Sequence, residues 1–598
     1  MATFVPARRA LAWTLGIAAL VAGFSYPVPE AEAAPNRYVT LSDGTSIAIN
    51  VRMPEGYVEG RRYPTIFEMS GYDGGSSDGT TPGNLSGEGS RGLTKHYERN
   101  YVTVHASVRG TGCSAGEFDL FSWRSALDGR ELVEWIARQP WSNGDVGIYG
   151  HSYGGITGFM VAATQPPHLR AVTVSGLIDD LYRGIVYPGG VANYGFPLLW
   201  TGAIRPFYDV GGGTFPGIAN GDEQCARNVA THRRTVLDDP ILEGLTDTDT
   251  NWYRSRSLIT YAERIRVPIH VTGAYQDEQT GPRGPYHLFE AVDGAPARRL
   301  VMTNGVHGTQ TSPEEVWRDR VAWMDYWLRG ASDAPARSSV TTLLEMTSDG
   351  SNGRIESRTF PLEQSRWRDL YLRSDGRLRF ASPGRDEGSD SYFSSGRQSW
   401  SYQGGEDTGP PLTTEEGPDE LTYRSKRFGR ATAIVGPATA TLYASSTAPE
   451  TELFVQVIDE APDGSRYYVQ RGMLRASHRA IDRGLSDKLD DGTIYRPWRP
   501  HTNPTLIEPG RVYRYLVEIF PFGHVFRPGH RLVVKIHAPP AVDSYYAYIP
   551  KRPPSVNTIL HDAKHPSSLM LPFVPLTGSG LGPAPDSCAL TGVRCVGG

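Results

Sequence analysis

The sequence predicts an α/β fold with a mostly parallel sheet, followed by a second domain built of short β-strands. Between about residues 36 and 175, apolar runs alternate with amphipathic segments of helical period, a pattern typical of parallel strands covered by helices. After Gly330, short alternating runs separated by Gly, Pro, Asp and Ser indicate the β-rich domain. Because 598 residues are too many for one hydrophobic core, two or three domains are expected.

Residues 1–33 are typical of a secretory signal. Arg8 and Arg9 form a basic start, residues 10–24 form an apolar stretch, and a small-x-small cleavage site ends at Ala33. The apolar stretch is shorter than the ~20 residues that span a bilayer. We therefore expect a cleaved signal peptide, a secreted protein and no stable membrane anchor, with the Sec and twin-arginine routes both open.

Several elements are expected before the first candidate site. Residues 38–53 are predicted to form a hairpin around an Asp-Gly turn, and residues 65–69 and 101–106 to form buried strands. An amphipathic helix is expected over residues 128–138, where the apolar side chains recur on one face. A proline and an Asn-Gly turn then lead into a strand at 146–149.

A serine motif follows that strand directly. Residues 150–154 read Gly-His-Ser-Tyr-Gly, and they are followed by a helix-forming segment at 156–163. A strained strand-to-helix turn needs small residues two positions either side of the serine, so that no Cβ clashes there. This is the layout of the nucleophile elbow in α/β-hydrolase folds. The pattern alone also fits a glycine-rich turn that contains a serine by chance.

The rest of the α/β domain is expected in two pieces. Residues 34–175 would form the first part of the core, and residues 176–260, rich in glycine and aromatic side chains, would form an inserted and largely helical cap. The core would resume over residues 261–335 with a strand, a helix, a second strand and a closing helix. Residues 336–598 are predicted to form a β-sandwich.

The four cysteines are an even number in a chain expected to reach an oxidising compartment. Cys588 and Cys595 lie close together in a Gly/Pro-rich tail, which predicts a disulfide between them. Cys113 and Cys225 either pair with each other or remain as buried thiols. Cysteine and histidine do not recur at ligand spacing, so no metal site is expected.

Composition and charge are those of an ordinary globular protein, with 39% hydrophobic residues, 21% charged residues and a net charge of −5. Nothing in this balance favours nucleic acid or anionic lipid as the main partner. The glycines of the loop Arg109–Gly116 fit neither the dinucleotide-binding nor the Walker spacing, which favours a structural role. We therefore expect a small-molecule substrate and no cofactor, and the sequence leaves self-association open.

The stretch around the serine motif is similar to a known family. A helix ending in Glu-Trp-Ile at Ile136, then Gln-Pro-Trp-Ser-Asn-Gly at residues 139–144, a strand, and Gly-x-Ser-Tyr-x-Gly resemble the family that contains cocaine esterase, X-Pro dipeptidyl peptidase and the α-amino acid ester hydrolases. Residues 472–476 and 526–532 resemble the jelly-roll domain of the same family. The resemblance implies an α/β-hydrolase with a cap and a jelly-roll domain that hydrolyses esters or amides through an acyl-enzyme, without a cofactor.

The order Ser, Asp, His along α/β-hydrolase chains assigns candidate catalytic residues. Ser152 is the expected nucleophile, Asp277 the expected acid in the loop after one strand, and His307 the expected base in the loop after the next. The resemblance supports His307, which precedes a glycine as the family's histidine does. The Asp277 loop is one residue longer than the family's Gly-Trp-Tyr-Asp, so Glu278 is a competitor for the acid.

Two tyrosines are the candidates for stabilising an oxyanion. The backbone N–H of Tyr153, directly after the nucleophile, is one expected donor. The second donor in the resembled family is a tyrosine hydroxyl after an early strand, and Tyr72 stands at that place. From the residues alone, a tyrosine at this place fits packing as well as catalysis.

Substrate choice stays open between three kinds of function. The first is hydrolysis of small acyl esters or amides, favoured by an aromatic cap. The second is X-Pro dipeptidyl-peptidase, α-amino acid ester hydrolase or β-lactam acylase activity, which needs an acidic cluster near the nucleophile for an ammonium group. The acids available for such a cluster are Asp179, Asp180, Asp209, Asp222, Glu223 and Glu278. The third is an inactive protein that binds carbohydrate or cell wall through its β-sandwich.

Overall fold

The computed structural model contains an α/β half and a β-rich half. It describes residues 37–72, 88–205, 221–232, 243–308, 311, 313–332, 338–347, 350–395, 419–538, 548, 553–576, 581–582 and 595–596. The expected signal segment lies outside these residues. None of the helices in the described ranges is both long and apolar enough to cross a membrane.

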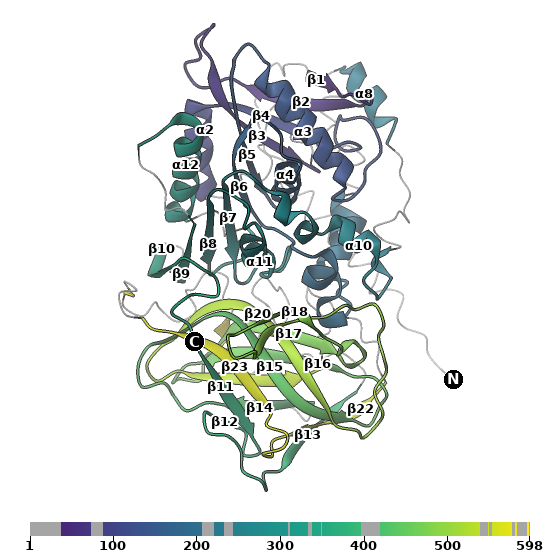
Figure 1. Ribbon diagram of the computed structural model, residues 1–598, viewed down its shortest axis with the longest axis vertical. Coiled ribbons are helices and arrows are strands. Elements are labelled where there is room, and N and C mark those ends of the chain that lie inside the picture. Colours follow the sequence, from purple (N-terminus) through teal and green to yellow (C-terminus); the bar gives the residue numbers. More distant parts are fainter. Residues whose placement is uncertain are drawn as a thin grey trace, which may run out of the picture. The chain divides into compact units, whose positions relative to one another are not determined.

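The first sheet is mixed, with a parallel centre and antiparallel edges (Figure 1). In the described part of the chain it has the strand order β1-β2-β4-β3-β5-β6-β7-β8-β9-β10. The register is parallel from β4 through β9 and antiparallel at β1–β2, β2–β4 and β9–β10. The strands are β1 (Arg37–Thr40), β2 (Ser46–Arg52), β3 (Tyr63–Ser70), β4 (Val102–Ser107), β5 (Ser142–His151), β6 (Leu169–Ser175), β7 (Ile269–Ala274), β8 (Arg298–Thr303), β9 (Ser339–Thr347) and β10 (Gly350–Ser357).

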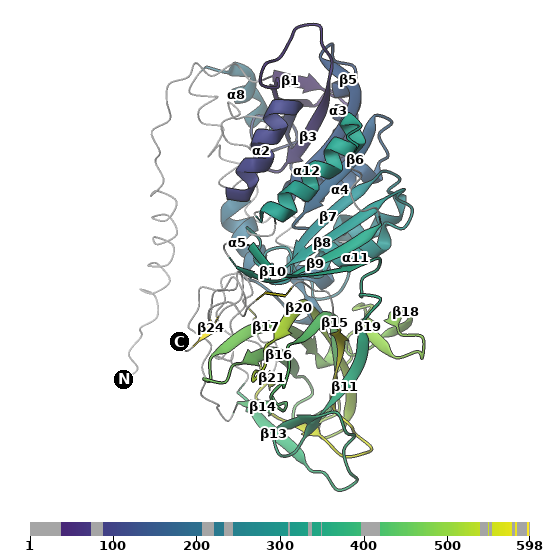
Figure 2. The same cartoon turned by 90° about the vertical axis from the view of Figure 1, so that its left-hand side faces the viewer.

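Helices cover both faces of this sheet, as parallel strands require. Helices α2 and α12 lie together on one face, and α3 and α4 pack on each other on the other face (Figures 1 and 2). Ser122 caps α3, because its side chain accepts a hydrogen bond from the backbone of Ser125. The helices are α2 (Glu88–Asn100), α3 (Trp123–Ala137), α4 (Tyr153–Ala163), α11 (Gly284–Ala291) and α12 (Glu314–Arg329). The α/β-hydrolase prediction is confirmed.

The segment between β6 and β7 forms the predicted cap from short helical pieces. Aromatic contacts hold it: the rings of Tyr182 and Tyr187 stack with centroids 5.1 Å apart, and Tyr253 packs edge-on against Tyr182 at 5.2 Å. The described pieces are η1 (Leu181–Val186), η2 (Pro188–Gly190), α5 (Phe196–Leu199), η3 (Trp200–Ile204), α8 (Glu223–Val229), α10 (Asn251–Arg256), η4 (Leu258–Thr260) and η5 (Ala262–Arg264).

The β-rich half is a large sheet that folds back on itself and is antiparallel except where β12 pairs with β14. Its path runs β13-β22-β15-β20-β17-β16-β21-β14-β12-β11-β23, and β15 pairs with β23, which gives the barrel-like closure of a sandwich. The strands are β11 (Arg366–Arg373), β12 (Arg377–Arg379), β13 (Ser389–Ser394), β14 (Glu420–Arg424), β15 (Thr432–Ser446), β16 (Glu452–Glu460), β17 (Arg466–Arg475), β20 (Tyr513–Phe526), β21 (Arg531–His537), β22 (Ser555–Leu560) and β23 (Ser568–Val574). Beside the sheet lie η6 (Ala476–His478), the hairpin of β18 (Asp482–Lys488) and β19 (Ile494–Trp498), and β24 (Cys595–Val596), which pairs with β17.

Strands β9 and β10 come after the point where the sequence predicted the second domain to begin. They pair with β8 and each other, so they extend the first sheet and do not enter the second. The expected boundary at residue 336 therefore lies between α12 and two strands of the α/β half. An antiparallel hairpin after a helix looks in sequence like the first strands of the next domain, which explains this difference.

A disulfide joins Cys113 to Cys225, which settles the alternative left open for these two cysteines. It links the loop after β4 to α8 in the cap across 112 residues of sequence, and both side chains are fully buried. The predicted partner of Cys595, Cys588, lies outside the described residues, so their pairing stays a prediction.

Candidate active site

Ser152 lies at the turn between β5 and α4, where the sequence predicts a nucleophile elbow. Its backbone has φ 56° and ψ −125°, a strained conformation for a residue with a side chain. Glycine is required on both sides: a Cβ on Gly150 would lie 2.3 Å from the Gly154 carbonyl oxygen, and a Cβ on Gly154 would lie 2.8 Å from a Glu68 carboxylate oxygen. The turn thus presents Ser152 at the carboxyl end of the central strand.

Asp277 and His307 form a hydrogen-bonded pair in the loops after β7 and β8. His307 Nδ1 lies 2.9 Å from Asp277 Oδ2, and both side chains are buried. Asp277 also accepts hydrogen bonds from the Gln279 and Thr280 amides at 3.0 and 2.9 Å and from the Thr280 hydroxyl at 2.6 Å. Burial acts to raise the pKa of Asp277, but His307 and these donors outweigh it and hold the pKa well below its usual range. A charged carboxylate therefore faces the imidazole.

The structure brings His307 next to Ser152. A Cβ built on Gly176, which follows β6, would lie 3.0 Å from Ser152 N, 3.0 Å from His307 Cε1 and 3.1 Å from His151 Cε1. The imidazole and the serine backbone thus flank the same small space, which only a glycine leaves open. A serine beside a carboxylate-bound imidazole is an arrangement that can activate a hydroxyl as a nucleophile.

Tyr72 and Tyr153 lie at Ser152, as the sequence predicts. The Tyr72 hydroxyl is hydrogen-bonded to the Ser152 side chain and accepts from Trp200 Nε1 at 3.2 Å. Because an indole nitrogen can only donate, the phenol proton of Tyr72 stays available for another acceptor. Burial raises the pKa of Tyr72, which keeps it protonated. Tyr153 is the first residue of α4, where backbone N–H groups have no acceptor within the helix.

A pocket opens beside Ser152 between the core and the cap, with a cavity volume of about 90 Å³, enough for several water molecules. Its walls are mostly aliphatic and aromatic, and no aspartate or glutamate of the described residues lines it. The main lining side chains are Tyr72, Leu120, Phe121, Ile156, Ile178, Leu181, Ile185, Tyr194, Phe196, Trp200 and Trp252.

Glu278, the predicted competitor for the acid, is bound elsewhere. Its Oε1 lies 2.5 Å from Nη1 of Arg471 on β17, and each residue is 1% exposed. Asp277, by contrast, contacts His307 directly. The extra residue in this loop therefore gives the second carboxylate a partner in the β-rich half.

The other acidic candidates for an ammonium site have partners of their own. Asp179 binds Arg283 and lies 2.6 Å from His287 Nδ1, and Asp180 lies 2.7 Å from Arg183. Asp222 caps α8, and Glu223 pairs with Arg227 at 3.2 Å. Asp209 lies outside the described residues.

The ring of His151 lies against His307, a contact that the sequence did not predict. The two ring centroids are 4.6 Å apart, and His151 Nδ1 lies 2.9 Å from Ser175 Oγ. Burial first, and then the nearby His307, lower the pKa of His151 well below its usual value, so it stays neutral. Sequence reasoning also missed Trp200 as the donor to Tyr72, because these residues are 128 positions apart.

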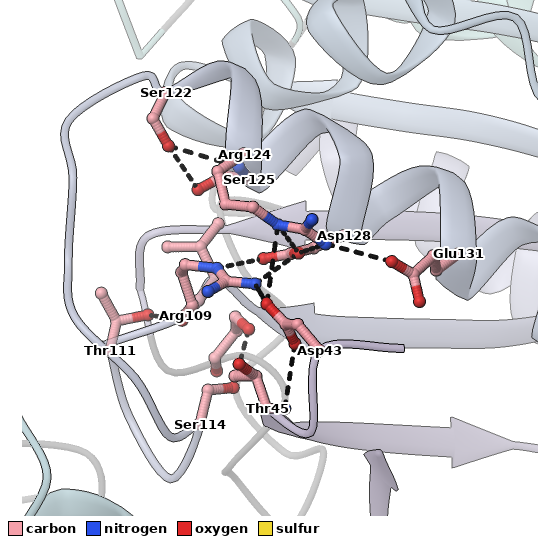
Figure 3. Close-up of polar contacts among 12 residues, drawn as sticks. Asp43, Thr45, Arg109, Thr111, Ser114, Ser122, Arg124, Ser125, Asp128 and Glu131 are labelled. Atoms are coloured by element: carbon pink, nitrogen blue, oxygen red, sulfur yellow. Dashed lines mark hydrogen bonds and ion pairs between the residues drawn. The ribbon is translucent and has the colours of Figure 1, made fainter. Parts of the chain in front are cut away.

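The loop Arg109–Gly116 is tied down by ion pairs, in agreement with a structural role (Figure 3). Arg109 donates to both carboxylate oxygens of Asp128 on α3, at 2.6 and 2.7 Å, and to Asp43 at 2.9 Å. Arg124 also binds Asp128, at 2.6 Å. The Arg109 guanidinium is therefore bound by carboxylates of the protein itself. Cys113 of the same loop forms the disulfide with Cys225.

This fold and elbow define an α/β-hydrolase that uses a serine, and the comparisons with known proteins agree. Residues 43–309 match the X-Pro dipeptidyl-peptidase family S15, and residues 336–570 match the C-terminal non-catalytic domain of X-Pro dipeptidyl-peptidases. The chain belongs to this family of serine hydrolases. The resemblance seen in the sequence is therefore confirmed.

Relatives cover nearly the whole chain. A Mycobacterium bovis protein named as a serine esterase is 26% identical over 90% of this chain and 95% of its own length. The cocaine esterase of a Rhodococcus species is 25% identical over 79% of this chain and 88% of its own. A CocE/NonD family hydrolase of Staphylococcus aureus has a similar fold, with a TM-score of 0.71, 20% identity, and coverage of 90% of this chain and 93% of its own.

Proposed function

We propose that this protein is a secreted esterase that cleaves esters of small apolar acyl groups through a Ser-His-Asp triad. The observation that carries the proposal is the convergence of Ser152, the His307–Asp277 pair and an apolar pocket at the end of β5. Each member has a distinct chemical role that its surroundings support.

In the proposed acylation step, Ser152 Oγ attacks the ester carbonyl carbon while His307 Nε2 takes the hydroxyl proton. Asp277 accepts from Nδ1 and stabilises the imidazolium that forms. The Tyr72 hydroxyl and the Tyr153 amide donate to the tetrahedral oxyanion. The bond to the alkoxide then breaks, the alkoxide takes the proton from His307, and the acyl group stays on Ser152. Water repeats the sequence to release the acid.

The walls of the pocket favour an acyl group without charge. An ammonium group placed there would lose its hydration and find no carboxylate among the described lining residues. Apolar and aromatic walls instead suit an aromatic or branched acyl group. This supports an esterase over the amino-selective members of the family.

The second candidate is X-Pro dipeptidyl-peptidase activity, which the names of the two matching families favour. It requires recognition of a substrate amino terminus. Two substrates that differ only in acetylation of the α-amino group separate the candidates: equal rates support the esterase, and activity confined to the free amine supports the peptidase.

The direct test is labelling with a fluorophosphonate, followed by assays with aryl esters, Xaa-Pro anilides and β-lactams. We expect labelling at Ser152 in the wild type, none in Ser152→Ala, and an esterase activity lower by several orders of magnitude in that variant. Labelling that persists in folded Ser152→Ala at another residue would refute the assignment.

Secretion is part of the proposal. A buried disulfide between Cys113 and Cys225 supports folding in an oxidising compartment, since such bonds are rare in reducing ones. Protein recovered from culture medium should begin near Ala34. A protein that stays inside the cell and still begins at Met1 would contradict secretion.

A further inference from the structure

The loop that carries Asp277 is held by the β-rich half of the protein. The Gln470 side chain on β17 donates from Nε2 to the Tyr275 carbonyl oxygen at 2.8 Å, and Gln276 Nε2 donates to the Val469 carbonyl oxygen at 3.4 Å. One residue further on, Arg471 binds Glu278 at 2.5 Å. Contacts therefore reach the loop on both sides of Asp277.

These contacts are themselves fixed within the β-rich half. Gln470 Nε2 also donates to the Pro521 carbonyl oxygen at 3.1 Å, and its Oε1 accepts from the Tyr468 hydroxyl at 3.0 Å. Arg471 Nη1 donates to the same hydroxyl at 3.2 Å. Tyr468, Gln470 and Arg471 are all buried. A buried network with several partners holds one geometry, so it can set the position of the loop.

The loop of His307 is tied to the same framework. Asn304, three residues before His307, donates from Nδ2 to the Gly523 carbonyl oxygen on β20 at 3.1 Å. The side-chain oxygen Oε1 of Gln276 accepts from the backbone N–H of Gly305 at 3.0 Å, and the backbone N–H of Gln276 donates to the Gly305 carbonyl oxygen at 3.0 Å. Hydrogen bonds thus connect the loop of Asp277, the loop of His307 and the β-rich half.

We propose that the β-rich half, whose matched family description calls it non-catalytic, completes the active site through Gln470 and Arg471 as positioning residues. This inference rests on the proposed function. Gln470 fixes the start of the loop, while Arg471 holds Glu278 and balances its charge. Of the two carboxylates that are adjacent in sequence, Asp277 then contacts His307 and Glu278 contacts Arg471.

The test compares Arg471→Gln, Arg471→Lys and the double variant Arg471→Gln/Glu278→Gln in the full chain. We expect Arg471→Gln to lower kcat by ~10- to 100-fold with little change in KM, as for other residues that orient a catalytic group. Arg471→Lys keeps the charge and should recover much of the loss. Circular dichroism and thermal unfolding establish that each variant is folded.

The pH profile gives a readout that mere destabilisation would not move. In Arg471→Gln, the Glu278 carboxylate loses the positive charge of Arg471 and favours the His307 imidazolium, so the acid limb of kcat/KM should move up by roughly half a pH unit or more. Among the described residues, Asp277 and His151 are titratable groups that contact His307, and Arg320 acts on His151 from α12. The double variant removes the extra charge and should return the limb to its original position.

Arg466→Gln is the matched control. Arg466 lies on the same strand, is 4% exposed and binds Glu460 at 3.2 Å, so its loss also leaves a buried carboxylate without that partner. It should lower stability without moving kcat or the acid limb. A folded Arg471→Gln with unchanged kcat and an unmoved limb, or an equal effect in Arg466→Gln, would overturn the proposal.

Hydrogen exchange separates this inference from the proposed function. The amides of Gln279 and Thr280 donate to Asp277, so a loosened loop should exchange faster at residues 275–280 in Arg471→Gln than in the wild type or Arg466→Gln. Failure of the fluorophosphonate to label wild-type Ser152 would refute the function but not this loop contact. Unchanged exchange at 275–280 would refute the contact even in an active esterase.

Discussion

Replacing Tyr72 with phenylalanine tests the oxyanion site with a small change in shape. The Tyr72 hydroxyl is hydrogen-bonded to the Ser152 side chain and also accepts a hydrogen bond from Trp200 Nε1 at 3.2 Å. In the proposed site it is one of two donors, the other being the Tyr153 amide. Loss of one such donor typically lowers kcat by ~10² to 10³, or about 2.7–4 kcal/mol of transition-state stabilisation. The apolar walls around Tyr72 give a replacement water few partners, so we expect the full loss.

The assay is steady-state hydrolysis of a 4-nitrophenyl ester, with kcat and KM measured separately. The loss should appear in kcat with KM nearly unchanged, because the hydroxyl contacts charge that develops only in the transition state. Tyr194→Phe is the control: Tyr194 lines the same pocket, but its hydroxyl lies 3.4 Å from that of Tyr187. A near-normal kcat in folded Tyr72→Phe, or an equal loss in Tyr194→Phe, would refute the role.

Three further predictions concern the site and the cap. Gly176→Ala should lower kcat by up to ~10²-fold in a folded protein, because the new Cβ would lie 3.0 Å from both Ser152 N and His307 Cε1 at a φ of +63°; kinetics and circular dichroism check this. Asp277→Asn should lower kcat by ~10⁴-fold and far more than Glu278→Gln, and the reverse order would move the acid role to Glu278. Removing the Cys113–Cys225 disulfide should lower the free energy of unfolding by up to about 4–5 kcal/mol in the chain-entropy model, measured by denaturation with and without reductant.

The residues on the elbow and after the strands could be predicted because their signals are local. Ser152 stands in a glycine frame that only a tight turn requires, and His307 and Asp277 follow apolar runs that had to be neighbouring strands. The structure then places His307 and Asp277 in contact. Where a motif carries its own geometric reason, one sequence is enough to indicate the site.

The contacts between distant segments could not be predicted in this way. Arg471 and Glu278 are 193 positions apart, and neither lies in a sequence motif that predicts their contact. The same holds for the His151 ring, whose contact with His307 depends on how the end of β5 meets the loop after β8. A buried arginine looks in sequence like any exposed one, since periodicity reports on apolar positions and not on charge partners.

The hairpin of β9 and β10 determines how this protein can be divided. A chain ending at residue 335 would keep every proposed catalytic side chain but would leave β8 as an open sheet edge, where unpaired N–H and C=O groups invite pairing with other molecules. Buried Val340, Leu343 and Leu344 would leave with the hairpin. A chimaera that joins the hydrolase half to a different β-sandwich would therefore need its junction after Ser357. The exchangeable hydrolase half is thus longer than residues 43–309, the segment that matches the catalytic family.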